Sequence, residues 1–323
     1  MTDLDILTVG RVGVDLYPEQ SGVPLAEVAT FAKSLGGTAT NVAVAAARLG
    51  RRSAVLTKVG PDGFGDYVRA ALEKFGVTAR HVGTAPNLLT PVVFCELTPP
   101  AEPTLLFYRA PIAPDLTLTE DEVPWETVDS VPLLWVTGTG VSAEPARGTQ
   151  RAILRRRARR AHTVLDLDYR PMFWPDEATA RAAIGAMLPR VSAVVGNREE
   201  TRVVVGTADP ARAADRLLAA GVRCAVVKCG AEGVLVATAD ERVRVPSHAV
   251  RVVCGLGAGD GFGGALAHGL LAGWPPRRLA EFANAAGALV ASRLACADAM
   301  PTAAEIEALL DGRPVVADGE RVG

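Results

Sequence analysis

The sequence predicts an α/β fold, in which a doubly wound and mainly parallel sheet is flanked by helices and carries a small β lid. From about residue 131 onward, short apolar segments alternate with helical segments, a rhythm typical of parallel βαβ units. Two earlier regions, at about residues 12–34 and 91–113, contain β-forming residues without this rhythm. We therefore expect a single domain over residues 1–323, with these two regions forming the lid.

In the first half of the chain, the expected strands and helices are bounded by the residues at which apolar runs end. Residues 5–10 read as a first buried strand, and an alanine-rich helix over residues 42–49 ends at Gly50. A second helix over residues 67–75 ends at Gly76. Further strands are expected at residues 53–59, 90–97 and 104–108, and the proline-rich stretch 99–103 favours a hairpin tip or an edge position.

The second half is expected to alternate regularly between strands and helices. Strands are predicted at residues 133–137, 163–168, 193–195 and 224–228, with a hairpin formed by 233–237 and 242–245. Helices are predicted at residues 143–160, 177–188 and 210–220, and the chain is mostly helical after residue 260.

Composition and charge exclude several classes of function. The chain is 49% hydrophobic and 22% charged, which is ordinary for a globular protein with a full core. A net charge of −2 provides no field suited to nucleic acid or to an anionic membrane. The basic run at residues 155–160 lies on a predicted helix without interleaved aromatic residues, so we interpret it as a solvated helix face.

The expected compartment is the cytoplasm. The N-terminal residues lack the charged and apolar regions of a signal peptide, and no apolar run approaches the roughly 18 residues of a membrane span. The five cysteines are scattered, without the paired spacing of a metal site. We expect them to be reduced and buried thiols.

The stretch over residues 250–264 is the most informative one. Valine-rich residues 250–253 have strand propensity, a small-residue turn follows, and a helical segment begins near Asp260. A strand, a glycine turn and a helix start together direct free backbone N–H groups at an anion. Gly257, Ala258 and Gly259 are therefore candidates for a phosphate cradle, with Asp260 as a general base beside it.

Other interpretations of this turn were weighed. A dinucleotide fingerprint is disfavoured because the spacing of the third glycine is wrong, and a Walker loop is excluded because the chain contains no Gly-Lys-Ser/Thr. A purely structural helix start, with Asp260 stabilised by the helix dipole, explains the stretch alone equally well.

Three motifs in order decide between these readings. The first motif is Gly36 and Gly37 followed by Asn41, the second is the Asn197-x-x-Glu200 spacing, and the third is residues 257–260. Together the three motifs resemble the signatures of the ribokinase-like (PfkB) carbohydrate kinases. The resemblance extends from about residue 6 to residue 310 and implies the ribokinase-like fold, ATP as phosphoryl donor and Mg²⁺ as its metal. Further stretches, at residues 10–20, 35–55, 90–96, 107–109 and 166–171, are similar to members of the family that act on sugar acids.

The resemblance also implies roles for residues of the sugar pocket. Asp15, Gly36, Gly37 and Asn41 would line it, since an aspartate can accept from two hydroxyls and glycines let the backbone approach closely. Tyr108 would contact the substrate, and Arg109 and Arg170 would hold its carboxylate, because a planar guanidinium matches a carboxylate well. For each arginine, a surface or intramolecular ion pair is the alternative.

On the nucleotide side, the resemblance implies that Asn197 and Glu200 order Mg²⁺ through water. Their alternative is a helix cap with a surface glutamate. The remaining nucleotide contacts would come from Lys228, Gly230, Gly233, Gly257, Gly259 and Asn284.

The expected activity is therefore ATP-dependent phosphorylation of the C6 primary hydroxyl of a sugar acid. A kinase for another sugar acid or for a neutral sugar such as fructose or ribose is the alternative, and a non-catalytic sugar-binding regulator is the alternative of a different class. Many members of the family have Asp-Thr before the glycine turn, where this chain has Cys254-Gly255, so activation by K⁺ is in doubt. A homodimer through the lid is the assembly that the resemblance implies.

Overall fold

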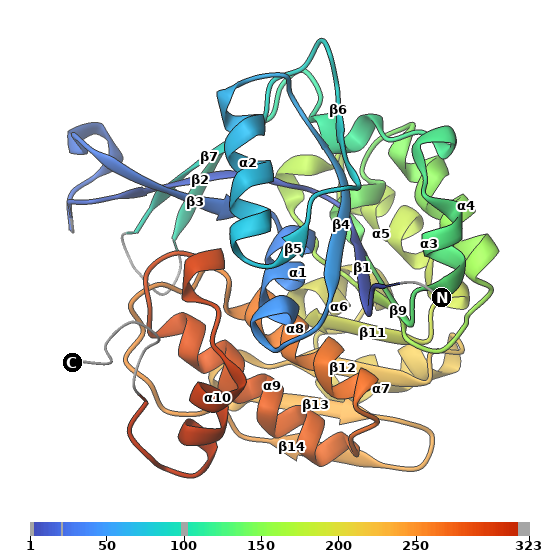
Figure 1. The fold of residues 1–323 in the computed structure, drawn as a ribbon. Helices are drawn as coiled ribbons and strands as arrows, with labels where there is room; N and C mark the ends of the chain where they lie inside the picture. The colour runs from blue at the N-terminus through green and yellow to red at the C-terminus, as the bar shows by residue number, and fades with distance from the viewer. Residues whose placement is uncertain (1–2, 21, 98–102, 316–323) are drawn as a thin grey trace.

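A computed structural model describes residues 3–20, 22–97 and 103–315 of the chain. Its centre is a ten-stranded sheet with helices on both faces, and a second, four-stranded sheet projects from one side of this body (Figure 1). The predicted α/β fold with a mainly parallel sheet is confirmed. No helix in the part of the chain that the structure describes combines the length and the apolar character needed to cross a membrane.

The central sheet has the order β14-β13-β12-β11-β10-β9-β1-β4-β5, and β6 pairs with β4. All its pairs are parallel except β12 with β13 and β13 with β14. Its inner strands are buried on both faces, as expected of a parallel sheet covered by helices. Its strands are β1 Ile6–Val9, β4 Ser53–Val59, β5 Val77–Thr78, β6 Val82–Thr84, β9 Leu133–Thr137, β10 Thr163–Asp166, β11 Ala193–Asn197, β12 Cys224–Lys228, β13 Val234–Ala237 and β14 Arg242–Val245.

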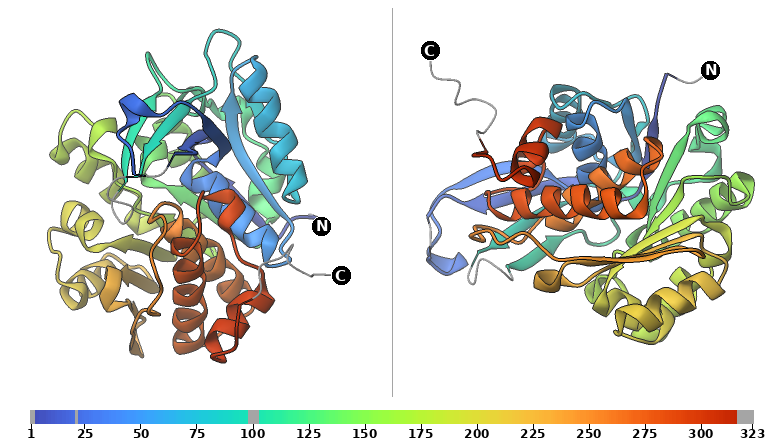
Figure 2. Two further views of the ribbon diagram at one scale, coloured as in Figure 1. Left: turned by 90° about the vertical axis from the view of Figure 1, so that its left-hand side faces the viewer. Right: turned by 90° about the horizontal axis from the view of Figure 1, so that it is seen from below.

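Two groups of helices cover the two faces of this sheet (Figures 1 and 2). One face packs against α1 Thr38–Arg48, α2 Gly63–Lys74, α8 Ala258–Leu271, α9 Pro276–Ala291 and α10 Ala303–Leu310. The opposite face packs against α3 Trp125–Ser130, α4 Ala146–Arg157, α5 Glu177–Gly185, α6 Arg198–Val205 and α7 Pro210–Ala219.

The second sheet has the order β3-β2-β7-β8, and its role as a lid stays a prediction. It consists of β2 Gly13–Pro18, β3 Phe31–Gly36, β7 Val92–Glu96 and β8 Thr104–Tyr108, which come from the two regions predicted to form it. Side chains alternate between its faces, so Asp15, Val93 and Phe107, which are paired across three strands, lie on one face. Val14, Val92 and Tyr108 lie on the other.

The predicted strand at residues 250–253 is wrong. This segment has no strand partner, and Val252 and Val253 are each 40% exposed. The sheet ends at β14, and Val253 N and Cys254 N donate instead to Ala291 O, at 2.9 and 3.2 Å. Valine-rich sequence favours a strand only where a neighbouring strand offers an edge. The predicted hairpin tip at residues 99–103 falls almost entirely outside the described residues.

Helices α1 and α8 pack directly against each other, and a hydrogen bond between Asn41 and Asp260 joins their N-terminal turns. A Cβ at Gly264 would overlap Ala45, and one at Gly263 would lie 3.0 Å from Val42. Both positions must therefore lack a side chain if the two helices are to pack at this distance. The glycine turn before α8 thereby lies beside the Gly36-Gly37 turn before α1.

Candidate active site

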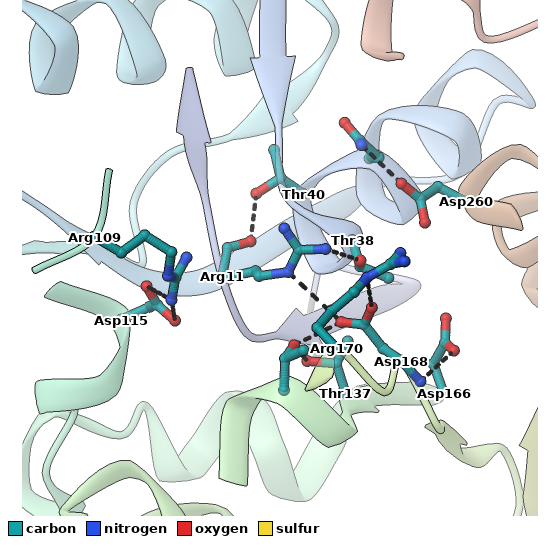
Figure 3. Close-up of polar contacts among 12 residues, drawn as sticks. Arg11, Thr38, Thr40, Arg109, Asp115, Thr137, Asp166, Asp168, Arg170 and Asp260 are labelled. Carbon is teal, nitrogen blue, oxygen red and sulfur yellow. Dashed lines mark hydrogen bonds and ion pairs between the residues drawn. The ribbon is translucent and has the colours of Figure 1, made fainter. Parts of the chain in front are cut away.

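Polar and charged residues gather where the strands of the central sheet end and where α1 and α8 begin (Figure 3). Arg11 follows β1, Asp166 and Asp168 lie at the end of β10, and Lys228 ends β12. The carboxyl edge of an open parallel sheet is where such folds bind their ligands. The lid sheet contributes Asp15 to this group.

Asp260 lies in the first turn of α8 and faces Asn41 of α1. Asn41 Nδ2 donates to Asp260 Oδ2 at 2.7 Å. Burial raises the pKa of Asp260 to about 6, although the hydrogen bond from Asn41 opposes this shift. A carboxylate with such a pKa can accept a proton from a hydroxyl near neutral pH more readily than an ordinary aspartate.

The turn before α8 has the geometry of an anion cradle. Gly257 has φ 78° and forms the N-cap of the helix, and a Cβ there would lie 3.0 Å from Cys296 Sγ. The N–H groups of a first helical turn have no partner within the helix, so those of Ala258 and Gly259 can bind an anion. A Cβ at Gly259 would lie 3.2 Å from Lys228 Nζ, which places a cation beside the same turn.

Asp15 is fixed against the glycine turn before α1. Its carboxylate occupies the space in which a Cβ of Gly36 would lie. Gly37 has φ 101°, and its own Cβ would overlap the carbonyl oxygen of Arg11. Burial raises the pKa of Asp15 to about 6, with Arg11 opposing and Asp260 adding to the shift.

A cluster of two arginines and one aspartate lies beside these groups (Figure 3). Arg11 Nε is 3.6 Å from Asp168 Oδ2, and Arg170 Nε is 3.3 Å from Asp168 Oδ1. Thr139 Oγ1 donates to Asp168 Oδ2 at 2.5 Å. Burial alone would raise the pKa of Asp168, but the two guanidinium groups hold it below its ordinary value.

Sequence reasoning found Arg170 but missed Arg11, Asp166 and Asp168. A usable signal was present, because each of these residues is polar and lies at or directly after the end of an apolar strand segment. In a parallel sheet such positions meet at one edge.

Two residues predicted to contact the substrate have protein partners in this structure. Arg109 donates from Nη2 to both oxygens of Asp115, each at 3.1 Å, and its guanidinium lies 4.8 Å from the centre of the Phe173 ring. The intramolecular ion pair is therefore what the structure shows for Arg109. Tyr108 is 65% exposed and contacts Phe94 on the face of the lid opposite Asp15. Phe107 occupies the inner face instead and packs against Phe173.

Asn197 and Glu200 form a capping box at the start of α6. Asn197 Oδ1 accepts from Glu200 N at 2.9 Å, and Glu200 Oε2 accepts from Asn197 N at 2.6 Å. Asn197 therefore caps the helix, as the alternative interpretation expected. Glu200, however, is only 5% exposed and is not a surface residue.

Glu200 belongs to a buried group of charges around Lys228. Burial favours the neutral amine, but Asp166, Glu200 and Asp260 raise the pKa of Lys228 above its ordinary value. Burial raises the pKa of Asp166 well above its ordinary value, and the charge of Lys228 opposes this shift.

These residues fit an Mg²⁺ ion held through water. Among the described residues, no three His, Cys, Asp or Glu side chains are placed to hold a metal directly. Glu200 uses Oε2 in the capping box, which leaves Oε1 for a water of a metal that arrives with phosphates. Mg²⁺ usually keeps several of its waters and binds through one or two carboxylates and substrate phosphates.

The remaining predicted nucleotide residues lie around the loop after β12. Gly230 and Gly233 have φ 60° and 91°, and a Cβ at Gly233 would overlap Val245 O. Asn284 of α9 donates to Val245 O at 3.2 Å and to Pro246 O at 3.0 Å. Asn284 therefore fixes the segment after β14, beside the loop that contains the two glycines.

Cys254, which stands where many ribokinase-like kinases have an aspartate, is fully buried. It packs in one cluster with Tyr17, Cys95 and Cys296, and Tyr17 Oη lies 3.0 Å from Cys296 Sγ. Burial raises the pKa of Cys254, so it is a neutral thiol and a poor ligand for K⁺. The expectation that activation by K⁺ is in doubt stays a prediction.

Comparisons with known proteins agree with this arrangement. The pattern described as pfkB family carbohydrate kinase matches residues 3–303. A 5-dehydro-2-deoxygluconokinase of Photobacterium profundum is 35% identical over 308 residues, which cover 93% of this chain and 92% of that protein. An uncharacterised sugar kinase of Pyrococcus horikoshii, solved in complex with ATP, is 26% identical in sequence to this chain. The two structures superpose with a TM-score of 0.79, and the match covers 93% of this chain and 96% of that chain. A fructokinase double mutant of Vibrio cholerae, solved with fructose, ADP and potassium ion bound, is 26% identical and gives a TM-score of 0.85, covering 96% of this chain and all of that chain.

Proposed function

The chain belongs to the pfkB family of carbohydrate kinases and is an ATP-dependent sugar kinase, and on this premise we propose that its substrate is 5-dehydro-2-deoxy-D-gluconate, a sugar acid of myo-inositol breakdown. The observation that carries the proposal is the placing of Asp260, Asn41 and Lys228 around the start of α8, with arginines close by. The name of the relative in Photobacterium profundum supports the choice of the acid.

The geometry supports transfer to a primary hydroxyl by in-line displacement. Asp260 takes the proton of the C6 hydroxyl as its oxygen forms a bond with the γ-phosphorus of ATP. The bond from that phosphorus to the β–γ bridging oxygen breaks, and ADP leaves. The N–H groups of Ala258 and Gly259, with the ammonium of Lys228, would stabilise the charge on the transferred group. Mg²⁺ bound near Glu200 would neutralise the charge of the phosphates.

Asp15 and Asn41 would hold the sugar during this step. Asp15 can accept from substrate hydroxyls, and the absence of a side chain at Gly36 leaves its carboxylate room against the glycine turn. Asn41 Oδ1 is buried and has no hydrogen-bond partner among the described residues, while Nδ2 donates to Asp260. Such an unpaired buried acceptor is costly unless a ligand donates to it. Arg170 would bind the carboxylate of the acid.

A turnover panel tests the proposal. The purified chain is incubated with ATP, Mg²⁺ and one of four acceptors: 5-dehydro-2-deoxy-D-gluconate, 2-keto-3-deoxy-D-gluconate, D-fructose or D-ribose. We expect the highest kcat/KM for the first. A higher value for another acceptor would reassign the substrate. Absence of turnover with all sugars and sugar acids would favour the non-catalytic regulator.

The pH dependence of kcat/KM should follow the ionisation of Asp260. Because burial raises its pKa to about 6, the base form is lost as the pH falls through this value. We expect kcat/KM to fall about tenfold per pH unit below pH 6 and to level off above about pH 7, as is usual for a general base. Asp15, with a pKa also near 6, would steepen the fall. A flat profile from about pH 5 to about pH 8 would contradict the role of Asp260 as base.

We also propose that two copies pair through the outer faces of their lids. On this face Phe94 packs edge to face against both Phe31 and Tyr108, and Leu106 is 43% exposed. Exposed apolar clusters of this kind mark interaction surfaces. In sedimentation velocity we expect a dimer for the wild type and a weaker dimer for Tyr108→Glu. A monomeric wild type at micromolar concentration would refute the pairing.

A further inference from the structure

The position of Arg11 indicates more than a structural role. Its side chain is 9% exposed and extends from the end of β1 into the site, where Nη2 donates to Thr38 Oγ1 at 2.7 Å. Its carbonyl oxygen accepts from Thr40 Oγ1 at 3.2 Å, so both its backbone and its side chain are fixed at the start of α1 (Figure 3). The Phe107 and Phe173 rings lie 5.9 and 6.0 Å from its guanidinium carbon.

Asp168 is shared between two arginines. One carboxylate faces two guanidinium groups, Arg11 at one oxygen and Arg170 at the other. The Arg170 side chain is 40% exposed, whereas those of Arg11 and Asp168 are 9% and 1% exposed, so a ligand can reach this arginine pair through Arg170.

The donors of these arginines are also incompletely used. The Nε atoms of Arg11 and Arg170 are buried, and neither makes a hydrogen bond of good geometry within the described structure, although both lie within ion-pair distance of Asp168. Arg109 differs, since its guanidinium faces both oxygens of Asp115 and its charge is matched one to one. Arg11 and Arg170 are therefore better prepared than Arg109 to receive a carboxylate.

Both arginines lie within electrostatic reach of the reacting end of the site. The charges of Arg11 and Arg170 each lower the pKa of Asp260, and Arg11 has the same effect on Asp15. An anion bound between the two guanidinium groups would thus lie near the pocket that Asp15 and Asp260 line. One end of a short sugar acid could reach the arginines while its hydroxyl end lies at Asp260.

We propose that Arg11 is a specificity-determining residue that binds the substrate carboxylate together with Arg170, and that Asp168 is a positioning residue that holds the two guanidinium groups in place. This inference rests on the proposed function, because it assigns the acid-binding part of the same site. It replaces Arg109 by Arg11 as the second arginine of the carboxylate site.

The test compares a sugar acid with its neutral isostere. KM and kcat are measured for 5-dehydro-2-deoxy-D-gluconate and for its C1 carboxamide, in the wild type and in Arg11→Met, Arg11→Lys, Arg170→Met and Arg109→Met. We expect Arg11→Met and Arg170→Met to raise KM for the acid about 10- to 100-fold, the usual loss for a charge-assisted contact, and KM for the carboxamide about twofold or less. Arg11→Lys keeps a cation beside Asp168 but loses the planar fork, so it should give an intermediate rise.

Arg51→Met is the matched control. Arg51 is also a partly buried arginine, but it donates to His268 Nδ1 at 3.2 Å and to His268 O at 3.1 Å, at the far end of α8 from Asp260. It should leave the ratio of the two KM values unchanged. A purely structural role for Arg11 would affect both substrates equally, and that outcome would overturn the proposal. So would a loss of acid preference in Arg109→Met that Arg11→Met does not show.

Calorimetric titration with the acid separates this proposal from the proposed function. If the wild type binds the acid but does not phosphorylate it, the proposed function fails, and a loss of binding in the Arg11 variants still supports the arginine pair. If the wild type phosphorylates the acid and Arg11→Lys binds it as tightly as the wild type does, the arginine pair fails while the proposed function stands. Arg11→Lys also keeps the test decisive if Arg11→Met does not fold.

Discussion

Asp260→Asn is expected to lower kcat about 10²- to 10⁴-fold, the range that a positioned general base contributes. The change removes the proton acceptor but keeps the shape of the side chain. The new amide oxygen can still accept from Asn41 Nδ2, which now donates to Asp260 at 2.7 Å. We therefore expect the dissociation constant of the sugar acid, measured by calorimetry, to change about threefold or less, because a uniform contact with the substrate is kept.

The control for this prediction is Asp209→Asn. Asp209 is the N-cap of α7 and accepts from Arg212 N at 2.8 Å, a role that asparagine fills equally well. It should leave kcat and stability unchanged. Near wild-type turnover by Asp260→Asn would show that Asp260 is not the base, and a loss of sugar binding equal to the loss of kcat would assign it to substrate binding instead.

Gly37→Ala is expected to destabilise the fold by more than about 3 kcal/mol, since it combines backbone strain with steric overlap. Gly37 has φ 101°, a conformation that L-residues with a side chain rarely adopt. In addition, its Cβ would overlap the Arg11 carbonyl and lie 2.9 Å from Val12 Cα, and neither backbone atom can move without displacing β2. Urea unfolding measures the loss, and the KM for the sugar acid should rise because Arg11 is displaced.

Gly50→Ala separates the two contributions. Gly50 lies just beyond the other end of α1 with φ 81°, but no atom lies within 4 Å of the Cβ it would acquire. Gly50→Ala should lower the free energy of unfolding by about 1–2 kcal/mol, from backbone strain alone, and should leave the KM for the sugar acid unchanged. Equal losses of stability in the two variants would contradict the overlap at Gly37.

Much of the fold could be predicted because it depends on local patterns. The strands at residues 53–59, 104–108, 133–137 and 224–228 have the predicted bounds, since apolar β-forming runs there are limited by glycine, proline or polar residues. The glycine turns before α1 and α8 were also recognisable, and the membership in the pfkB family that their spacing implied is confirmed.

Local sequence patterns did not predict the structure correctly where the same residues fit two arrangements equally well. Phe107 and Tyr108 are adjacent aromatic residues of one strand, so one must face inward and the other outward, and the sequence does not show which. Residues 250–253 have the composition of a strand, but whether a strand forms depends on a free sheet edge. The sheet ends one element earlier, at β14.

The sequence by itself determined most of the elements, the two glycine turns and the candidate groups for phosphoryl transfer. These depend on backbone conformation and on residue type, which are local properties. Only the tertiary structure decided which charges meet. Asn41 contacts Asp260 across 219 positions of the chain, Arg109 is neutralised by Asp115, and Arg11 joins Arg170 at Asp168. The physical reason is that the pKa of a buried group, and the ligand it can bind, are set by whichever charges the fold brings close to it in space.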